Sequence, residues 1–484
     1  MTKITIRRFD RNVVQALTNR GFPEPLARAL AARHVTSPSD LDYEFKEMLS
    51  PWDLKNCREA GEAIADAIWK QKKIVIIGDY DCDGATAVSV GILGLQALGA
   101  FNVSYLIPDR DKDGYGLSPQ LVDRAAAAGA ELIITVDNGI SSVAAVEHAK
   151  TLGIEAVVTD HHLPGDEIPD TLVVNPNQRG DTFPSKSLAG VGVIFYVLIA
   201  VRSALRAKGA YPNGKQPNLQ HLIDLVALGT VADVVPLDRN NRILVSKGLD
   251  SIRAGKMQPG VSALLSVAGK NAHRISANDL GYILGPRINA AGRLDSINKG
   301  VECLTSYDYN TALFYAKELD QINAERRNRE VSMQSDAILS LQTISVDDSN
   351  SIVLKGDDWH AGIIGLVASR IKEQTYRPVI AFAPSEENGE HVLKGSGRSI
   401  PGIHLRDALD RVSKLSPGLI LKFGGHAMAA GLTIRKDAFD EFKELFARAV
   451  KELSDPEMFE RNIVTDGELR ASDFNIEPVS CTHL

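Results

Sequence analysis

Seven residues, Gly78 to Gly84, constrain this chain more than any other stretch, because they place three carboxylates in one turn. They follow the apolar run Ile74 to Ile77, which predicts a buried strand, and precede the segment Ala85 to Leu98, which predicts a helix. Ligands bind at the carboxyl ends of strands in open α/β sheets, and negative charges this close repel one another unless a cation lies between them. The stretch therefore predicts a divalent metal site.

The pattern Asp-x-Asp-x-Asp-Gly also begins the calcium-binding EF-hand loop, which ends in a bidentate Glu at its twelfth position. Counted from Asp79, that position is Val90, and the preceding segment is strand-like rather than helical. These two observations argue against an EF-hand. A purely structural alternative, in which the aspartates cap the helix near Ala85, accounts for one carboxylate and not for three.

The order of strand, loop and helix repeats along the following residues. Leu132 to Val136 and Ala156 to Val158 predict two more apolar strands, which end at Asp137-Asn138-Gly139 and Asp160-His161-His162. In a parallel, doubly wound sheet these strand ends meet at one edge. We therefore expect an α/β fold that gathers carboxylates and imidazoles into a single site.

Three more features follow along the chain. Asp233 lies in an almost wholly apolar stretch, where a carboxylate needs a cationic partner, and a buried salt bridge is the alternative to a metal. Residues 285–295 predict a loop that could bring Arg287 and Arg293 close to a phosphate. Residues 311–341, which contain no Pro or Gly, predict a long connecting helix, and its charges are typical of a solvated face.

A second α/β unit begins near Ser351. It contains two glycine-rich stretches, 395–398 and 424–426, which combine open backbone with a cation or an imidazole and so suit a phosphate oxygen, although such glycines more often form turns. A chain of 484 residues is expected to form two to four domains. The predicted organisation is an N-terminal appendage (1–58), a catalytic domain (59–303), a connecting helix (304–345), a second α/β domain (346–455) and a tail (456–484).

Composition excludes several classes of protein. The four cysteines are scattered, which argues against a disulfide framework or a zinc site. The N-terminus lacks the apolar core of a signal peptide, and the longest apolar run, 188–201, is shorter than the roughly twenty residues that span a bilayer. We therefore expect a cytoplasmic protein without a membrane segment. A net charge of −7 leaves only a local basic surface for a polyanion.

Taken together, Asp79 to Gly84, the motifs at Asp137 and Asp160, and Asp233 resemble the four motifs of the DHH phosphoesterase superfamily. Residues 424–431 resemble the signature of its accessory DHHA1 domain. Several further stretches are similar to the bacterial RecJ family of exonucleases within that superfamily: 113–118, 188–192, 229–233, 285–295 and 393–400. The resemblance spans roughly residues 74 to 434, and it identifies the two α/β domains as DHH and DHHA1 domains.

The resemblance implies a site that holds two divalent ions, Mn²⁺ or Mg²⁺, which suit oxygen and imidazole ligands. The implied metal residues are Asp81, Asp83, Asp137, His161 and Asp233, with Asp137 as the bridge, and with Asp79 and Asp160 beside them as ligands or as groups that orient ligands. His162 would face the scissile phosphate and act in catalysis with Asp83, Asp137 and His161. The implied phosphate contacts are Arg110, Arg287, Asn289, Arg293, Ser396, Arg398, Gly424, Gly425 and His426, with the terminal 5′-phosphate near Arg398.

The implied activity is 5′ to 3′ hydrolysis of single-stranded DNA to 5′-mononucleotides, in a cleft between the two domains that admits one strand. DNA repair and recombination, a single-strand-binding protein, a helicase and a monomeric state are implied by the resemblance alone. RecJ chains continue into an OB-fold domain, whereas only about twenty residues follow Val464 here, too few for a five-stranded barrel. We therefore expect at most an incomplete start of that domain.

Two alternatives remain. Oligoribonucleases, cyclic-dinucleotide phosphodiesterases and a manganese pyrophosphatase use the same metal motifs, but they tend to be shorter and to lack the stretches at 188–192 and 285–295. A DHH-like protein that binds single strands without cutting them has degraded metal motifs, whereas every expected ligand is present here.

Overall fold

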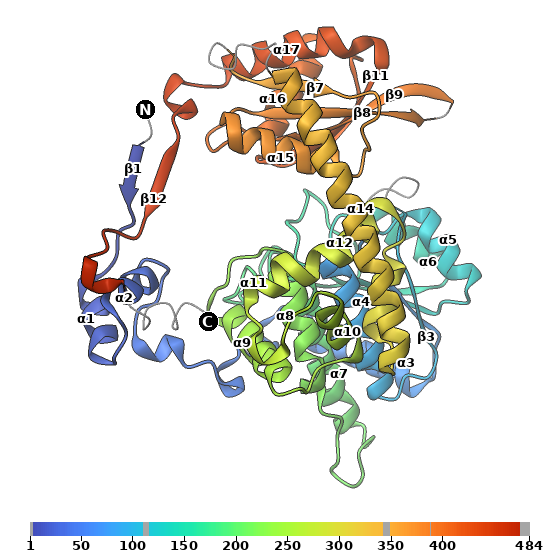
Figure 1. The fold of residues 1–484 in the computed structure, drawn as a ribbon. Coiled ribbons are helices and arrows are strands. Elements are labelled where there is room, and N and C mark those ends of the chain that lie inside the picture. Colours follow the sequence, from blue (N-terminus) through green and yellow to red (C-terminus); the bar gives the residue numbers. More distant parts are fainter. Residues whose placement is uncertain (1–2, 110–115, 342–348, 388, 475–484) are drawn as a thin grey trace. The chain divides into compact units, whose positions relative to one another are not determined.

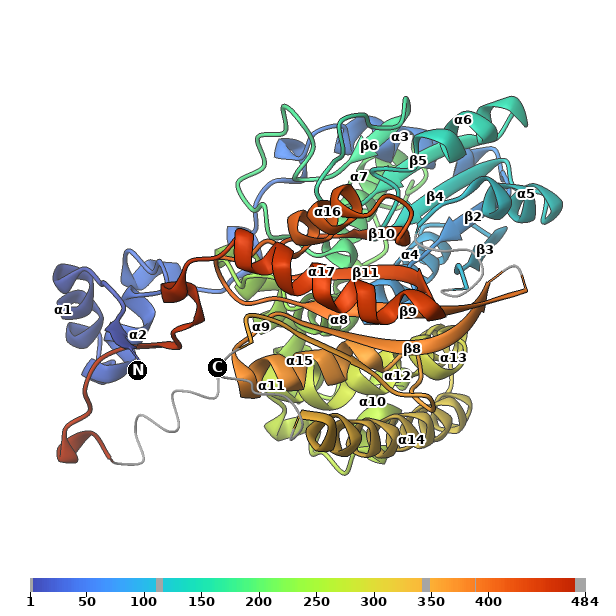
Figure 2. The same ribbon diagram turned by 90° about the horizontal axis from the view of Figure 1, so that it is seen from above.

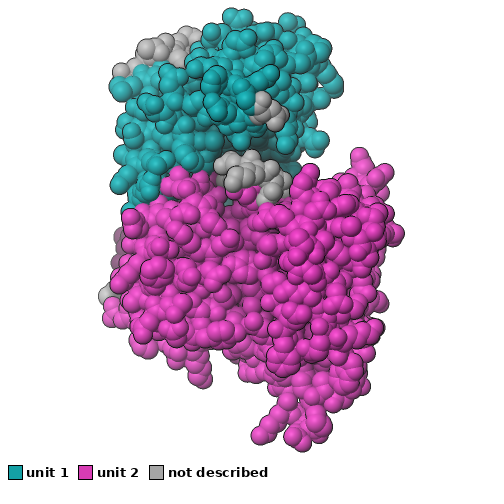
Figure 3. Space-filling view, turned by 90° about the vertical axis from the view of Figure 1, so that its right-hand side faces the viewer, with its two compact units in different colours: residues 1–9, 324–470 teal, residues 10–323, 471–484 magenta. Residues whose placement is uncertain are grey.

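The computed structural model describes residues 3–109, 116–341, 349–387 and 389–474. The chain forms two compact units, which Figure 3 colours separately. The larger unit consists of residues 10–323 with 471–484, and the smaller unit of residues 1–9 with 324–470. The boundary between them falls within the long helix α14 (Tyr309–Leu341), which the sequence predicted as a connecting helix.

The larger unit contains a parallel five-stranded sheet with the order β3-β2-β4-β5-β6. Its strands are β2 (Ile74–Ile77), β3 (Val103–Leu106), β4 (Leu132–Val136), β5 (Glu155–Thr159) and β6 (Leu172–Val174). The predicted doubly wound sheet is therefore confirmed. Strands β3 and β6 were not predicted, because β3 carries the polar Ser104 among half-buried residues and β6 has only three residues.

Helices cover both faces of this sheet (Figures 1 and 2). Alternate strand residues such as Val75 and Ile77 pack with α5 (Pro119–Ala127) and α6 (Val143–Thr151). The intervening residues, such as Ile74 and Ile76, pack with α3 (Cys57–Trp69), α4 (Cys82–Ala97) and α7 (Gly190–Ala207). Because side chains alternate between the two faces of a sheet, a strand that is buried on both faces has a continuous run of apolar residues in its sequence.

Helix α7 is long and apolar enough to cross a membrane by length and composition, and among the described residues it alone passes that test. It packs in the core of the larger unit, where Val191, Tyr196 and Val201 are fully buried. Its apolar character is therefore explained by burial against α3 and α4.

The remaining helices of the larger unit follow α7 or precede the sheet. They are α1 (Arg11–Asn19), α2 (Glu24–Ala31), α8 (Ile223–Ala232), α9 (Arg239–Arg253), α10 (Pro259–Val267), α11 (Ala277–Asp279), α12 (Gly285–Leu294) and α13 (Asn298–Thr305). The first two enclose a small core of their own around Leu17, Ala27 and Val35.

The smaller unit contains a five-stranded sheet with the order β10-β11-β9-β8-β7, in which only β7 and β8 are parallel. Its elements are β7 (Ile352–Lys355), α15 (Ile364–Thr375), β8 (Val379–Glu387), β9 (Glu390–Arg398), α16 (Leu405–Leu415), β10 (Ile420–Gly425), β11 (Ala429–Arg435) and α17 (Phe439–Glu452). Helices α16 and α17 pack on one face, where the Phe382 ring meets that of Phe442 edge to face (Figure 1).

Two loop predictions are wrong. Residues 285–294 form helix α12, and its Gly292 serves close packing rather than a turn, because a Cβ there would lie 2.0 Å from the Tyr80 carbonyl oxygen. Residues 423–426 are the second stretch predicted as a loop, and the first three of them belong to strand β10 (Ile420–Gly425), in which Gly424 pairs with Gly431. In both places glycine was read as a turn signal, whereas the fold uses its small size within a regular element.

The ends of the chain also form structure that the sequence did not predict. Strand β1 (Lys3–Ile6) pairs in parallel with β12 (Asn462–Thr465). The Arg7 Nη1 to Asp466 Oδ1 distance of 3.0 Å places an ion pair beside this ribbon. Pairing across more than 450 residues of sequence leaves no local signal, since each strand has only four residues.

Candidate metal centre and phosphate site

The loop after β2 delivers the first three carboxylates. Asp81 is the N-cap of α4, and its Oδ1 accepts a hydrogen bond of 2.9 Å from the Gly84 amide. Asp83, in the first turn, is buried and accepts hydrogen bonds from the amides of Gly190 (2.7 Å) and Val191 (3.0 Å). The first turn of α7 therefore fixes the orientation of the Asp83 carboxylate.

Asp137 follows β4 with a φ of +61°, a backbone conformation that residues other than glycine rarely adopt. The next residue, Asn138, ties neighbouring strand ends together: its Nδ2 donates to the carbonyls of Ile77 (3.1 Å) and Val136 (2.9 Å). Strain of this kind persists only where the surroundings enforce it, and it clusters at functional sites. Here it belongs to a buried carboxylate at the predicted metal site.

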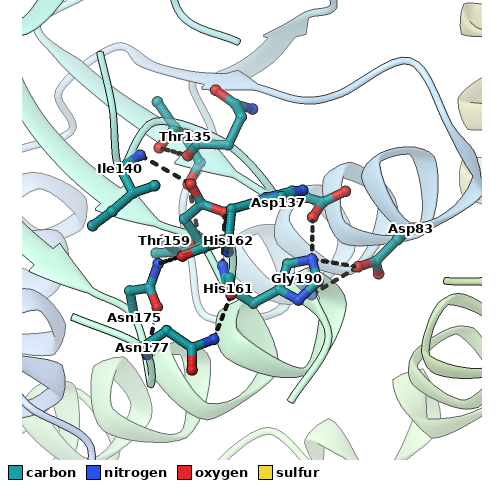
Figure 4. A network of polar contacts seen from close by, with 12 residues as sticks. Asp83, Thr135, Asp137, Ile140, Thr159, His161, His162, Asn175, Asn177 and Gly190 are labelled. Carbon is teal, nitrogen blue, oxygen red and sulfur yellow. Dashed lines mark hydrogen bonds and ion pairs between the residues drawn. The ribbon is translucent and has the colours of Figure 1, made fainter. Parts of the chain in front are cut away.

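Asp160 contacts the two histidines that follow it, which Figure 4 labels. Its Oδ1 accepts hydrogen bonds from the His161 amide (2.7 Å), the His162 amide (3.1 Å) and His162 Nδ1 (2.8 Å), and its Oδ2 accepts one from the Ile140 amide (2.9 Å). With four donors already bound, Asp160 is placed to orient the histidines. Its role as a ligand stays a prediction.

Asp233 reaches the site from the C-terminal end of α8. This helix can approach α4 closely because Gly229 has no side chain: a Cβ there would lie 2.1 Å from Thr86 Oγ1 and 2.8 Å from Asp83 Oδ1. The His161 Nε2 atom lies 3.5 Å from Asp233 Oδ2 and 3.1 Å from Asp137 Oδ1. The structure thus brings Asp83, Asp137, His161 and Asp233 together, as the sequence predicted.

Electrostatics favour a cation at this point. Burial, reinforced by the charge of Asp81, raises the pKa of Asp83 to about 7, and burial with the charge of Asp83 raises that of Asp233 to about 9. Burial lowers the pKa of His161 to about 4, so its imidazole is neutral at neutral pH. Among the described residues, the buried atoms His161 Nε2 and Asp233 Oδ2 have no hydrogen-bond partner. A divalent ion would satisfy both and would allow the carboxylates to ionise.

Three overlapping groups of side chains have ligand atoms within 4.8 Å of one another. They are Asp79 with Asp81 and Asp137; Asp83 with His161 and Asp233; and Asp137 with His161 and His162. Asp137 and His161 each belong to two of the groups, and the role of Asp137 as the bridge stays a prediction. The donors are oxygen and imidazole nitrogen, which fits Mn²⁺ or Mg²⁺.

His162 differs from its neighbour. Burial acts to lower the pKa of His162, but the hydrogen bond to Asp160 and the charges of Asp79 and Asp233 outweigh it and raise that pKa to about 9. An imidazole held by Asp160 in this way can donate to a phosphate oxygen.

Some predicted phosphate contacts have protein partners in the larger unit. Arg287 is buried, with its Nη2 2.8 Å from Asp320 Oδ1 and its Nη1 donating to the Ile283 carbonyl. Asn289 Oδ1 accepts a hydrogen bond of 2.8 Å from the Cys82 amide and so supports the metal-binding loop. Arg293 lies in the same helix, α12. Arg110 lies outside the described residues.

The smaller unit contains a second polar cluster. A Cβ added at Gly365, in the first turn of α15, would lie 2.8 Å from Arg398 Nη2 and 2.9 Å from Ser396 Oγ. A helix N-terminus, a guanidinium group and a hydroxyl therefore meet at one point, which is the chemistry of a phosphate site. In the same sheet Gly431 pairs with Ser396 on one side and with Gly424 on the other, so Gly424 lies two strands away from Ser396. The phosphate contacts of Gly424, Gly425 and His426 stay predictions.

Sequence reasoning missed Gly365 and the pair Asn175 and Asn177, which bond the histidine backbone. The Asn-Pro-Asn run was the available signal, but it follows β6, a strand that was itself not predicted.

Comparison with known proteins gives a consistent result. Residues 73–230 match the profile of the DHH family, N-terminal domain, and residues 348–452 match that of the DHHA1 domain. The chain is 50% identical over 463 residues to the single-stranded-DNA-specific exonuclease RecJ of Salmonella typhimurium, which covers 94% of this chain and 80% of that protein. It is 35% identical to RecJ of Bacillus subtilis over 95% of this chain and 56% of that protein.

Among solved structures, RecJ of Thermus thermophilus in complex with Mn²⁺ superposes with a TM-score of 0.80 at 31% identity, covering 97% of this chain and 65% of the Thermus chain. The chain thus spans less than two thirds of that protein. The Mg²⁺ complex of the Thermus protein gives a TM-score of 0.75 at 29% identity.

Proposed function

Because this chain belongs to the RecJ family of DHH phosphoesterases, we propose that it is a metal-dependent exonuclease that hydrolyses single-stranded DNA. The observation that carries the proposal is the convergence of two buried acids, Asp83 and Asp137, and the half-buried Asp233 on the neutral imidazole of His161. Without a metal ion such a cluster is unfavourable, because burial raises the free energy of every charged group in it.

Two divalent ions would be held by six side chains, those of Asp79, Asp81, Asp83, Asp137, His161 and Asp233. Such ions supply an activated water and neutralise charge on the phosphoryl oxygens. The protein itself orients the ligands. Asp160 accepts hydrogen bonds from the amides of both histidines, and the first amides of α7 donate to Asp83. His162, whose ring is hydrogen-bonded to Asp160, would donate to the phosphate or to the leaving oxygen.

Direction along the strand would come from the smaller unit. Ser396, Arg398 and the N-terminus of α15 would bind a terminal 5′-phosphate, which makes cleavage proceed from the 5′ end and release 5′-mononucleotides. The family resemblance also supports a role in DNA repair and recombination in the cytoplasm, as a monomer that works with a single-strand-binding protein and a helicase.

The test is digestion of a 5′-phosphorylated, 3′-labelled single strand with Mn²⁺, beside the duplex, an RNA copy and pyrophosphate. We expect stepwise shortening of the DNA single strand from its 5′ end, and loss of that activity in the double variant Asp81→Ala, His161→Ala. The matched control is Asp123→Ala, His148→Ala, which removes an Asp and His pair 2.7 Å apart on the surface of the same unit and should keep full activity.

Retained cleavage in Asp81→Ala, His161→Ala would contradict the proposal. Cleavage of short RNA or of pyrophosphate alone would assign the chain to a sister phosphoesterase activity, and binding of the strand without cleavage would make it a single-strand binder.

A further inference from the structure

The segment that follows β6 lies against the backbone of the histidine pair. It reads Asn175-Pro176-Asn177, and the side-chain amides of both asparagines donate to backbone carbonyl oxygens. Figure 4 shows both asparagine side chains pointing at the histidine backbone, away from the imidazole of His161. Their contacts therefore call for a role other than metal binding.

Each asparagine bonds a different histidine. Asn177 Nδ2 donates to the His161 carbonyl oxygen at 2.6 Å, and Asn175 Nδ2 donates to the His162 carbonyl oxygen at 2.9 Å. The two are also linked, because Asn175 Oδ1 accepts a hydrogen bond of 2.7 Å from the Asn177 amide. Asn175 is fully buried, so its donor has no water to replace the histidine carbonyl.

These bonds complete a pattern that begins with Asp160. The amide nitrogens of His161 and His162 both donate to Asp160 Oδ1, while their carbonyl oxygens accept from Asn177 and Asn175. Each histidine is thus held on both sides of its Cα. Fixing both flanking peptides fixes φ and ψ, and the backbone conformation in turn selects the side-chain rotamer.

At its other end the same segment contacts the Asp83 carboxylate. Within the segment, Lys186 Nζ donates to the Pro176 carbonyl oxygen (2.6 Å) and to Asp181 Oδ1 (2.7 Å). Asn177 Nδ2 also donates to the Lys186 carbonyl oxygen at 3.2 Å. The segment then enters α7, whose first amides hold Asp83. Residues 175–191 therefore contact the backbone of His161 and His162 and the carboxylate of Asp83.

We propose that Asn175 and Asn177 are positioning residues with separate effects: Asn177 orients the metal ligand His161, and Asn175 orients the phosphate-facing His162. The inference rests on the proposed function, in which the two histidines have different tasks. It predicts that a defect at Asn177 appears as weaker metal binding, whereas a defect at Asn175 appears as slower turnover at saturating metal.

The variants are Asn177→Asp and Asn175→Asp, which keep the shape and one oxygen acceptor, replace the amide donor with a second oxygen and introduce a carboxylate, a change that the control below also makes. We expect Asn177→Asp to raise the Mn²⁺ dissociation constant by about 10-fold or more and to leave kcat at saturating Mn²⁺ within about 2-fold. We expect Asn175→Asp to lower kcat by about 10-fold or more with an unchanged Mn²⁺ dissociation constant. Mn²⁺ affinity is measured directly, by electron paramagnetic resonance of the free ion in a titration, and kcat on a labelled single strand.

Gln178→Glu is the matched control. Gln178 lies in the same segment, is also buried, and donates through Nε2 to the Val173 carbonyl oxygen at 2.8 Å, so the variant removes the same kind of bond from a residue that does not touch the histidines. Both its Mn²⁺ affinity and its kcat should match the wild type. Thermal unfolding is recorded for every variant, and Asn175→Ser and Asn177→Ser replace any aspartate variant that does not fold.

The inference is overturned if both asparagine variants match the wild type, if both change the same parameter, or if Gln178→Glu reproduces their defects. A wild-type protein that binds Mn²⁺ but does not cleave DNA would instead contradict the proposed function. In that case the inference is tested by Mn²⁺ affinity alone: Asn177→Asp should bind Mn²⁺ more weakly than Gln178→Glu, and equal affinities would overturn it.

Discussion

Gly190 lies so close to Asp137 that a Cβ added to it would stand 2.5 Å from the Asp137 Oδ1 atom. The amide of the same glycine donates to Asp83 Oδ2 at 2.7 Å. Gly190, at the start of α7, therefore limits the space available to the Asp137 side chain and orients the Asp83 carboxylate. Neither carboxylate can move aside freely, since both are buried.

We expect Gly190→Ala to lower Mn²⁺ affinity and exonuclease activity by about 10- to 100-fold, because the new methyl group must displace Asp137. Metal titration and the rate on a single strand measure the effect. Gly192→Ala is the control: it lies in the same helix, and its Cβ would meet the flexible end of Leu188 at 2.5 Å rather than a carboxylate. Equal losses in the two variants would show that helix packing, and not the ligand, is responsible.

Asp224 provides a prediction about stability and pH. It is fully buried in the first turn of α8, its Oδ2 accepts from the Gln258 amide at 2.6 Å, and burial raises its pKa to about 7. The folded protein therefore keeps a proton that the unfolded chain loses near pH 4. The stability contributed by this protonation is fully present below about pH 4 and is lost as the pH rises through about 7.

Asp224→Asn keeps the acceptor for Gln258 and removes the titration. Between pH 5 and pH 8 we expect the wild type to lose about 1 kcal/mol or more of unfolding free energy relative to the variant. Chemical denaturation at both pH values measures the difference. A wild type that gains stability relative to Asp224→Asn over this range would contradict the prediction.

Arg398 tests the phosphate site of the smaller unit. Arg398→Ala should reduce the preference for a 5′-phosphorylated over a 5′-hydroxyl strand by about 10-fold, because a charged hydrogen bond to phosphate contributes roughly 1.5–3 kcal/mol. The ratio of the two cleavage rates measures this preference. Arg435→Ala, on the neighbouring strand β11, removes an exposed guanidinium that contacts the Gly418 carbonyl and should leave the ratio unchanged.

Salt dependence tests the nature of the substrate contact. If phosphate contacts carry most of the binding, the logarithm of the single-strand affinity should fall linearly with the logarithm of salt concentration, by about 0.7 for each phosphate neutralised. Fluorescence anisotropy with a labelled strand gives the slope, and Arg398→Ala should make it shallower. A flat plot for the wild type would argue against a basic binding surface.

The sequence by itself determined the parallel sheet and the edge that carries the metal site. The apolar runs of β2, β4 and β5 and the acids that follow them are local patterns, and the rule for parallel sheets places those strand ends together. Asp233 was a candidate from its apolar surroundings, which left a buried salt bridge as the alternative, and the family motifs assigned it to the metal site.

Only the tertiary structure decided how these groups are held. The Gly190 amide on Asp83, the asparagines behind His161 and His162, and the helix formed by residues 285–294 all depend on segments that meet in space and lie far apart in sequence. Glycine misled the sequence reading because the same residue serves a turn, a strand or a close helix contact, and which of these it serves depends on the neighbour that packs against it.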